Sequence, residues 1–216
     1  FVGCHRLPIR HGMTVGELSR MFRSEQKMQL DLQIIPLEGW RRSDYFDATG
    51  LPWVNPSPNM RTLAEALLYP GIGLLEFTNL SVGRGTATPF ELFGAPWLDG
   101  RSFAELLDAE GLPGVRFRAV AFVPRASKFA GQPCGGIEMT VTDRDAFRPI
   151  RTGLTIARLL RQAYPKAWET KHYDRLLGNR RVFEAILSDA PISAIEPGYQ
   201  PELDEFLKRR ARFLLY

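Results

Sequence analysis

Four positions along the chain combine a hydroxyl residue with a glutamate three residues later, the pattern that caps the start of a helix. The pairs, in chain order, are Thr14 with Glu17, Thr62 with Glu65, Thr88 with Glu91, and Ser102 with Glu105. We expect the first helix to run to about Lys27 and the second to end before Tyr69-Pro70-Gly71. The third, with Pro89 at its first position, is expected to end at Gly94, and the fourth at Gly111.

Apolar runs between these helices predict β-strands over residues 32–37, 73–77, 115–123 and 137–141. The third run alternates small or apolar residues with Arg116 and Arg118, so one of its faces meets solvent or a ligand. Past Asp143 the spacing becomes helical again and predicts helices over residues 154–164, 182–187 and 203–215. The pattern therefore predicts an α/β fold of the mixed α+β kind, with a small mixed sheet flanked by helices and a helical C-terminal third.

The composition of the 216 residues, 44% hydrophobic and 24% charged, is that of a globular protein. It excludes a disordered tail, a collagen-like rod and a coiled coil. No run approaches the roughly 18 apolar residues of a membrane helix, and residues 1–10 lack the order of a signal peptide, so we expect no membrane span. The net charge of +4 is accompanied by acids interleaved with arginines near residues 143–148, which argues against a nucleic-acid partner.

The cysteines and histidines do not form a metal-binding pattern. Cys4 and Cys134 have no close-spaced partner, and the three histidines stand at no ligand spacing from them, so we expect neither a metal site nor a cofactor. One disulfide between the two cysteines and two unpaired thiols are both compatible with the sequence, which leaves the redox compartment open.

The most informative polar segment follows the apolar run 73–77. Glu76 stands at the end of this predicted strand, and the loop after it carries Asn79, Ser81 and the sequence Gly83-Arg84-Gly85-Thr86 before a predicted helix. Glycines let backbone amides turn toward a ligand and a helix N-terminus favours a negative group, so a carboxylate, a phosphate or a sugar oxygen could bind beside Arg84. Thr88 stands where a dinucleotide fingerprint has its third glycine, which excludes that motif. A tight turn with Arg84 in a surface ion pair is the structural alternative.

Two further segments present polar groups near predicted helix starts. Arg10 and His11 precede the first helix in the same manner as the glycine loop, so the two loops could face one cleft, although a hydrogen-bonded structural histidine is the commoner case. In the segment 53–59, prolines fix the backbone and hold Asn55, Ser57 and Asn59 still beside a tryptophan. This segment could present its amides and hydroxyl to a sugar, or serve only as a loop before the second helix.

Short motifs in one order along essentially the whole chain resemble the exo-β-N-acetylmuramidase family, formerly a bacterial domain of unknown function. The motifs are Pro8-Ile-Arg-His-Gly-Met-Thr14, Gly39-Trp-Arg-Arg42, Thr49-Gly-Leu-Pro-Trp53, Pro56-Ser-Pro-Asn59, Tyr69-Pro-Gly71, Thr78-Asn79, Gly83-Arg-Gly-Thr86, Pro89-Phe-Glu91, Gly94-Ala-Pro-Trp97, Cys134-Gly-Gly136, Thr142-Asp-Arg-Asp145 and Phe213-Leu-Leu-Tyr216.

The resemblance implies an exo-acting glycosidase that releases N-acetylmuramic acid from the non-reducing ends of peptidoglycan fragments in cell-wall turnover. It also implies two halves with a substrate cleft between them, of which residues 1–216 correspond to the C-terminal α/β half. The N-terminal Rossmann-like half, whose Pro-Glu-His-Gly-like segment carries the family's catalytic glutamate, is expected to be absent, because nothing in this sequence matches that segment. The expected partners are muramyl sugars and that other half.

Within this half, the family role and the residues point to the same loop. The lactyl carboxylate of N-acetylmuramic acid calls for an arginine fork or a helix N-terminus, which the Arg84 loop is expected to supply. Glycoside hydrolysis usually needs two carboxyl groups, and Glu76 is the candidate contributed by this chain, with a structural glutamate as its alternative. A non-catalytic muramyl-sugar-binding or scaffold module is the alternative function. The family suggests a cell-envelope or secreted setting, with a cytoplasmic recycling enzyme as the alternative.

Overall fold

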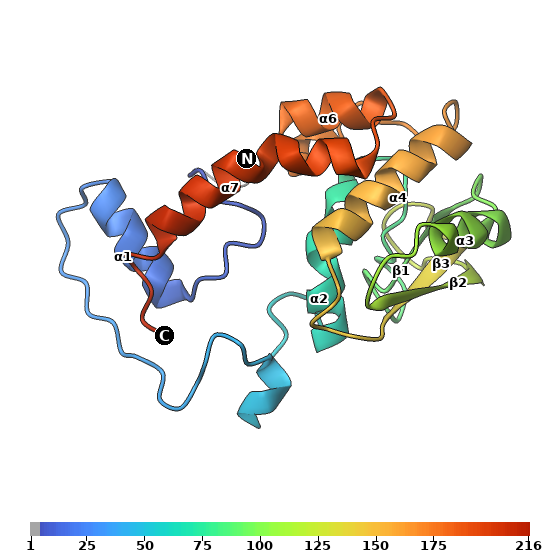
Figure 1. Cartoon of the computed structure of the whole chain (residues 1–216). Coiled ribbons are helices and arrows are strands. Elements are labelled where there is room, and N and C mark those ends of the chain that lie inside the picture. The colour runs from blue at the N-terminus through green and yellow to red at the C-terminus, as the bar shows by residue number, and fades with distance from the viewer. Residues whose placement is uncertain (1–4) are drawn as a thin grey trace. The chain divides into compact units, whose positions relative to one another are not determined.

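The structure is a computed structural model that describes residues 5–216, and the chain divides into two compact units (Figure 1). The first unit comprises Phe1–Pro52 with Tyr199–Tyr216, and the second comprises Trp53–Gly198. Each unit is described by itself below. None of the helices in residues 5–216 combines the length and apolar character needed to cross a bilayer.

Helical elements come first along the described residues, the strands follow with one helix between β1 and β2, and further helices come after β3. They are α1 (Val15–Glu25), the 3-10 helix η1 (Phe46–Thr49), α2 (Leu63–Ile72), the 3-10 helix η2 (Gly73–Phe77), β1 (Leu92–Ala95), α3 (Gly100–Ala109), β2 (Val115–Phe122), β3 (Cys134–Val141), α4 (Pro149–Ala163), α5 (Asp174–Leu177), α6 (Arg180–Leu187) and α7 (Ile192–Arg210). The predicted mixed α/β fold with a helical C-terminal third is confirmed.

A three-stranded sheet forms one side of the second unit, in the order β1-β3-β2. Both strand pairs are antiparallel, so the sheet is small as predicted but not mixed. The central strand β3 carries the fully buried Ile137 and Met139, and α3 adds Phe103 and Leu107 from the face against which it packs (Figure 1). Arg118 on the edge strand β2 reaches Glu138 across the sheet, at a position exposed to solvent. The predicted alternation is confirmed for Arg116, Phe117 and Arg118, which are exposed, buried and exposed in turn. It does not hold beyond them, because Ala119 and Ala121 are exposed and Val120 is half-buried.

The helices α2 and α4 cross at unusually short range in the second unit. A Cβ atom at Gly71 would lie 2.2 Å from the Pro149 carbonyl oxygen, and one at Gly153 would lie 2.5 Å from the Gly71 carbonyl oxygen. Only glycine allows two backbones to approach so closely. This contact holds the end of α2, from which η2 continues without a break.

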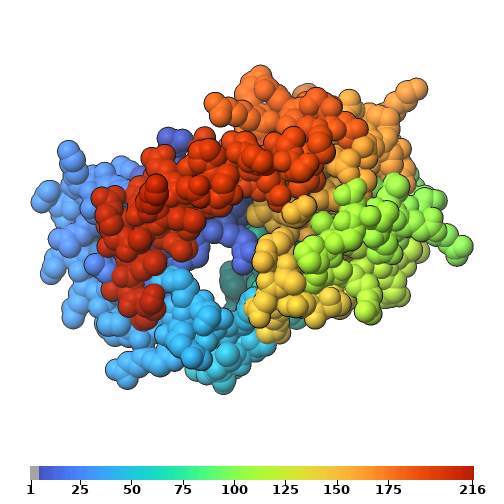
Figure 2. All heavy atoms as spheres, in the orientation of Figure 1, coloured from blue at the N-terminus to red at the C-terminus, as the bar shows by residue number. Residues whose placement is uncertain are grey.

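The first unit has a small core between α1 and the last part of α7. Met13, Met21 and Phe206 are buried there, and partly buried hydrophobic residues from α1 and from the chain after α7 pack around them. The segment 28–37 that follows α1 is extended but has no strand partner among the described residues (Figure 1). Ile35 is 86% exposed, and blue atoms of the N-terminal residues form part of the surface shown in Figure 2.

Several predicted elements differ from the structure. Residues 32–37 are extended without forming a strand, and residues 73–77 are a buried 3-10 helix, because a short apolar run does not distinguish a strand from a buried helical turn. The Thr62 helix does not stop before Tyr69-Pro70-Gly71 but continues to Ile72. The helix α3 is capped by Asp99 rather than Ser102. At the C-terminal end, α7 begins at Ile192 rather than near residue 203 and stops at Arg210.

The helix predicted from Thr88 to Gly94 is absent. Phe90 adopts a left-handed backbone with φ of 64°, which interrupts a right-handed helix, and its amide donates to the Val82 carbonyl at 2.8 Å. Ser81 and Gly94 exchange backbone hydrogen bonds of 2.8 and 2.9 Å, so the chain doubles back and enters β1. The Glu91 side chain accepts from the Thr62 hydroxyl instead of capping a helix of its own.

Candidate functional site

The Gly83–Thr86 loop is a tight turn with two left-handed glycines, at φ of 78° and 82°. The Thr86 hydroxyl donates to the Gly83 carbonyl at 2.6 Å, and the buried Ser81 hydroxyl accepts from the Gly83 amide at 3.3 Å. A Cβ atom at Gly85 would lie 2.3 Å from the Ala126 carbonyl oxygen, so this loop rests directly on the loop 124–131. The glycines are therefore required by backbone geometry, and no helix N-terminus stands behind them.

Arg84 points from this turn to Glu76, which η2 carries, and the two side chains form a two-pronged ion pair. Arg84 Nε donates to Glu76 Oε1, and Arg84 Nη2 donates to Glu76 Oε2 at 3.2 Å. The guanidinium also lies 5.1 Å from the centre of the Phe90 ring. With 30% and 22% of their side chains exposed, both residues remain accessible from solvent. The sequence predicted both residues but not that they pair with each other.

Lys128 completes a cationic cluster at this turn, and sequence reasoning missed it. Its Nζ donates to the backbone carbonyl of Glu76, and the lysine lies on a loop in which Ser127 and Phe129 both have left-handed backbones. Burial lowers the pKa of Lys128, the Glu76 carboxylate counteracts this, and the nearby Arg84 guanidinium lowers it further. Two cations facing one carboxylate leave the cluster, Glu76 with Arg84 and Lys128, with a net positive charge.

Two of the predicted ligand-binding side chains serve the fold. The Asn79 amide donates to the Ala167 carbonyl and accepts from the Glu169 amide, each at 2.7 Å, and so ties the loop to the chain after α4. Ser81 is buried and bonded within its own turn. The carbonyl of Thr86 accepts from Arg61 at 3.1 Å, which links the turn to the start of α2. These contacts keep the Arg84 turn in place.

Glu91 is a second carboxyl group near the same turn. It is half-buried, and its Oε1 accepts from the Thr62 hydroxyl at 3.4 Å. Burial raises the pKa of Glu91, the buried carboxylate of Glu65 raises it further, the Thr62 hydrogen bond opposes this, and Glu138 adds to the increase. A raised pKa is the direction of shift that favours a carboxyl group acting as a general acid.

The proline-rich segment before α2 is a solvent-facing turn. The Ser57 hydroxyl accepts from the Asn59 amide at 3.3 Å, and the Trp53 indole donates to the Met60 carbonyl at 3.2 Å. Asn55 and Ser57 are exposed, whereas Asn59 is half-buried. The predicted turn is therefore present, and Asn55 and Ser57 are its exposed polar residues.

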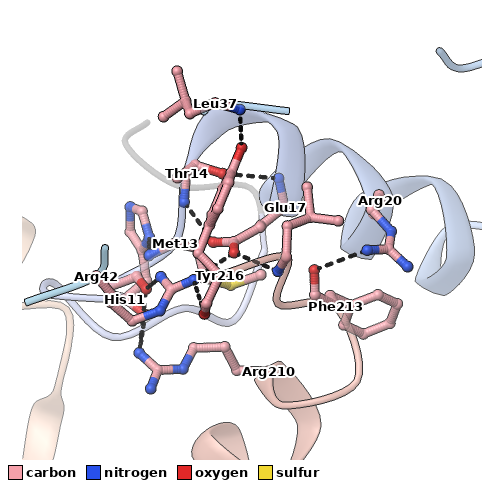
Figure 3. Close-up of polar contacts among 12 residues, drawn as sticks. His11, Met13, Thr14, Glu17, Arg20, Leu37, Arg42, Arg210, Phe213 and Tyr216 are labelled. Carbon is pink, nitrogen blue, oxygen red and sulfur yellow. Dashed lines mark hydrogen bonds and ion pairs between the residues drawn. The ribbon is translucent and has the colours of Figure 1, made fainter. Parts of the chain in front are cut away.

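Arg10 and His11 belong to the first unit, whereas the Arg84 turn belongs to the second. Arg10 is exposed. His11 Nδ1 accepts from the Met13 amide at 3.1 Å, and its carbonyl accepts from Arg210 at 3.0 Å (Figure 3). Burial, and secondarily the Arg210 charge, lowers the pKa of His11, which favours the neutral imidazole. His11 thus has the hydrogen-bonded structural role that the sequence left open for it.

The cysteine and metal-ligand chemistry of the described residues is simple. Cys134 is a buried free thiol whose pKa is raised by burial, and Cys4 lies outside the described residues. Within residues 5–216, no group of three or more His, Cys, Asp or Glu side chains is arranged to hold a metal ion.

Comparisons with known proteins cover the chain from end to end. A family model described as the C-terminal part of exo-β-N-acetylmuramidase NamZ matches residues 67–216, and one for the N-terminal part matches residues 1–64. The peptidoglycan β-N-acetylmuramidase NamZ of Bacillus subtilis (strain 168) is 41% identical over 219 residues. The match covers 100% of this chain and 53% of that protein, so the chain spans about half the length of its relative.

Two solved structures share the fold. Both are DUF1343 family proteins of Bacteroides fragilis NCTC 9343 and are 24% identical to this chain, with TM-scores of 0.79 and 0.74. The first match covers 100% of this chain and 59% of the other, and the second covers 95% and 56%. The C-terminal family model alone spans more than two thirds of the residues, in agreement with the ordered motifs. The chain therefore belongs to the exo-β-N-acetylmuramidase NamZ family.

Proposed function

We propose that the protein containing this chain releases N-acetylmuramic acid from the non-reducing ends of peptidoglycan fragments. The observation that carries this proposal is the 41% identity to a peptidoglycan β-N-acetylmuramidase over the entire chain. In this proposal, residues 67–216, which match the C-terminal family model, act as the substrate-binding α/β part. The Rossmann-like N-terminal part, whose family model matches residues 1–64, supplies further catalytic groups.

The cluster of Glu76, Arg84 and Lys128 is suited to hold the lactyl carboxylate of the sugar. Glu76 neutralises one of the two cations and fixes the Arg84 guanidinium, so one positive charge remains for an incoming anion. Lys128 Nζ is bonded to a neutral carbonyl, which a carboxylate can outcompete. A hexosamine without the lactyl group has no carboxylate to pair with this positive charge. The cluster therefore favours muramic acid over glucosamine.

The test of the proposed function is the release of free N-acetylmuramic acid from a muramic-acid-terminated disaccharide, followed by mass spectrometry. We expect release by the protein that contains both halves and none by residues 1–216 alone. Absence of release by the two-half protein, together with retained binding of the disaccharide, would instead support the non-catalytic muramyl-sugar-binding module. Release by residues 1–216 alone would place all catalytic carboxyl groups in this chain.

Replacing Glu76 by Gln is expected to lower kcat/KM for the disaccharide by at least about tenfold, because it removes the carboxylate that fixes Arg84. Glu184→Gln is the matched control, since Glu184 forms an ion pair with Arg180 on α6 and 57% of its side chain is exposed. Steady-state kinetics of both variants checks the prediction. A Glu76→Gln enzyme within a few fold of the parent would remove Glu76 from the proposed site.

A double-mutant cycle with Arg84→Gln separates two roles for Glu76. If Glu76 acts only by holding Arg84, the loss in the double variant equals that in Arg84→Gln alone. If Glu76 also acts on the sugar as a carboxylate, Glu76→Gln costs more in kcat than Arg84→Gln.

Replacing Lys128 by Met is expected to weaken binding of N-acetylmuramic acid by about tenfold, because a charge-assisted hydrogen bond to the lactyl carboxylate is lost. Binding of N-acetylglucosamine should stay unchanged, since that sugar has no lactyl group. Inhibition constants for the two sugars measure both effects, with Lys166→Met, an exposed lysine of the same unit, as control. Equal weakening of both sugars would show that Lys128 does not read the carboxylate.

The apolar side chains on the outer side of the segment 28–37 support an interaction with the rest of the N-terminal part, whose family model matches residues 1–64. Ile35 and Leu37 are 86% and 55% exposed, whereas Ile34 packs toward α1.

We place the whole protein in the cell envelope or outside the cell, where its wall-derived substrate is found, with cytoplasmic recycling as the alternative. Fractionation of cells, with detection of the protein by antibody, distinguishes these settings.

A further inference from the structure

The first unit contains an open groove of about 600 Å³ that no step of the proposed function uses. It lies between the end of α1, the extended segment after it and the tail that follows α7. All of its lining residues belong to the first unit. Its volume falls within the range of roughly 300–1,000 Å³ that is typical of sites for small ligands.

Four cations line this basic groove, namely Arg20, Arg23, Lys27 and Arg212, and no acidic residue does. Among residues 5–216, no carboxylate oxygen lies within 4.0 Å of any of the four side-chain cations. Arg20 donates only to the backbone carbonyl of Phe213, at 3.4 Å (Figure 3). The acids of α1 are bound elsewhere, because Glu17 pairs with Arg42 and Glu25 with Arg209. The groove is therefore an uncompensated positive surface.

Lys27 occupies a backbone position that ordinarily selects glycine. Its φ is 51°, its amide donates to Ser24, and the amide of Met28 donates to Arg23 at 2.9 Å. These two hydrogen bonds form the motif that closes a helix with a left-handed residue, where glycine has no steric penalty. A lysine at this position accepts backbone strain and places its side chain at the groove. Strain of this kind at a cationic site points to a use for the side chain.

The floor of the basic groove is apolar. Leu32, Ile34 and Phe213 line it and are half-buried, and Met28 and Leu215 extend it toward solvent. A Cβ atom at Gly16 would come within 2.8 Å of Ile34 Cγ2, so the floor packs directly on α1. Inorganic anions gain nothing from such a floor. A ligand that combines several carboxylates with aliphatic groups satisfies both the rim and the floor.

We propose that the basic groove binds a short acidic peptide, whose carboxylates meet Arg23, Lys27 and Arg212 and whose aliphatic side chains rest on Leu32 and Phe213. The residues that line the groove belong to the first unit, whereas the Arg84 turn belongs to the second. This inference therefore does not depend on the proposed muramidase activity.

The test measures fluorescence anisotropy of a labelled Glu-Leu-Glu-Leu-Glu peptide with the purified full-length protein. We expect saturable binding that weakens as salt is raised, and no binding of Gln-Leu-Gln-Leu-Gln or Glu-Ser-Glu-Ser-Glu. Replacing Arg23 and Arg212 together by Gln should raise Kd at least about tenfold, whereas the matched pair Arg180 and Arg116, which are exposed in the second unit, should leave it unchanged. Equal binding of the Glu-Ser peptide, or tighter binding of tripolyphosphate or anionic vesicles, would overturn the acidic-peptide assignment.

Lys27→Gly separates binding from folding, because it removes the cation and relieves the backbone strain in one change. We expect the midpoint of thermal unfolding to stay equal or rise while Kd for the acidic peptide rises several fold. An unchanged Kd with a higher midpoint would show that Lys27 has no part in binding and would contradict the proposal. Lys27→Ala, which removes the charge but keeps a Cβ, should weaken the peptide to the same extent without the gain in midpoint.

Discussion

Replacing Glu17 by Gln is expected to destabilise the protein by about 3 kcal/mol. The Glu17 side chain is 0% exposed. Its carboxylate accepts hydrogen bonds from the Thr14 amide, the Arg42 guanidinium and the Leu215 amide (Figure 3). A glutamine amide would turn an N–H group toward one of these donors and would leave Arg42 without its counter-charge. One buried acceptor would thus become an unsatisfied donor beside an unpaired cation.

Urea unfolding of the whole chain measures this loss as a shift in midpoint. Glu184→Gln is the matched control, because Glu184 also pairs with an arginine on its own helix, but with 57% of its side chain exposed. Exposed pairs of this kind contribute about 0–1 kcal/mol, so the control midpoint should barely move. Similar small shifts in both variants would show that the contacts of Glu17 do not stabilise the packing of α1 against the C-terminal tail.

The same carboxylate makes stability depend on pH. Burial alone would raise the pKa of Glu17, but the hydrogen bonds from Arg42, Leu215 and Thr14 and the charge of Arg42 outweigh it, so the pKa is lowered from its ordinary 4.5. A depressed pKa stabilises the fold above the unfolded value, and this contribution is lost as pH falls through the folded value. Unfolding midpoints of the parent and of Glu17→Gln should therefore converge as pH decreases below about 4.5.

The two roles of Glu17 show how far local sequence predicts structure. Its place in the capping box with Thr14 follows from a spacing of three residues, and the structure confirms it. The same holds for Thr62 with Glu65. The contacts of Glu17 with Arg42 and Leu215 join residues 25 and 198 positions apart, and no local spacing encodes them. The local spacing therefore predicted the helix starts at Thr14 and Thr62, but it failed at Thr88 and Ser102.

The Arg84 turn shows why the candidate site was only partly predictable. Its glycines and arginine were found from their types, because left-handed turns and anion contacts select those residues. The helix predicted after it failed at Phe90, whose left-handed backbone is stabilised by the sheet bridge between Ser81 and Gly94. Lys128 contacts the turn from a loop 52 positions after Glu76 in the sequence. No motif around Lys128 indicates this contact. The absent helix and the missed lysine therefore both depend on contacts between residues that are distant in the sequence.

Replacing Gly71 by Ala is expected to cost about 3 kcal/mol of stability, because the added methyl group meets rigid backbone rather than a side chain that can move. Its Cβ would lie 2.2 Å from the Pro149 carbonyl oxygen, at the crossing of α2 and α4. Thermal or urea unfolding measures the loss. Gly198→Ala is the matched control, since it makes the same change within a helix where nothing lies within 4 Å, and should be neutral or stabilising by up to about 1 kcal/mol.

The effect of Gly71→Ala should extend to the Arg84 turn. Because η2 continues directly from α2, any separation of α2 from α4 displaces the segment that carries Glu76, and with it the pairing partner of Arg84. We therefore expect kcat/KM of the two-half enzyme to fall under conditions in which the variant is still folded, whereas Gly198→Ala leaves it unchanged. If Gly71→Ala lowers the unfolding midpoint but keeps full activity, the crossing supports the fold without positioning the site.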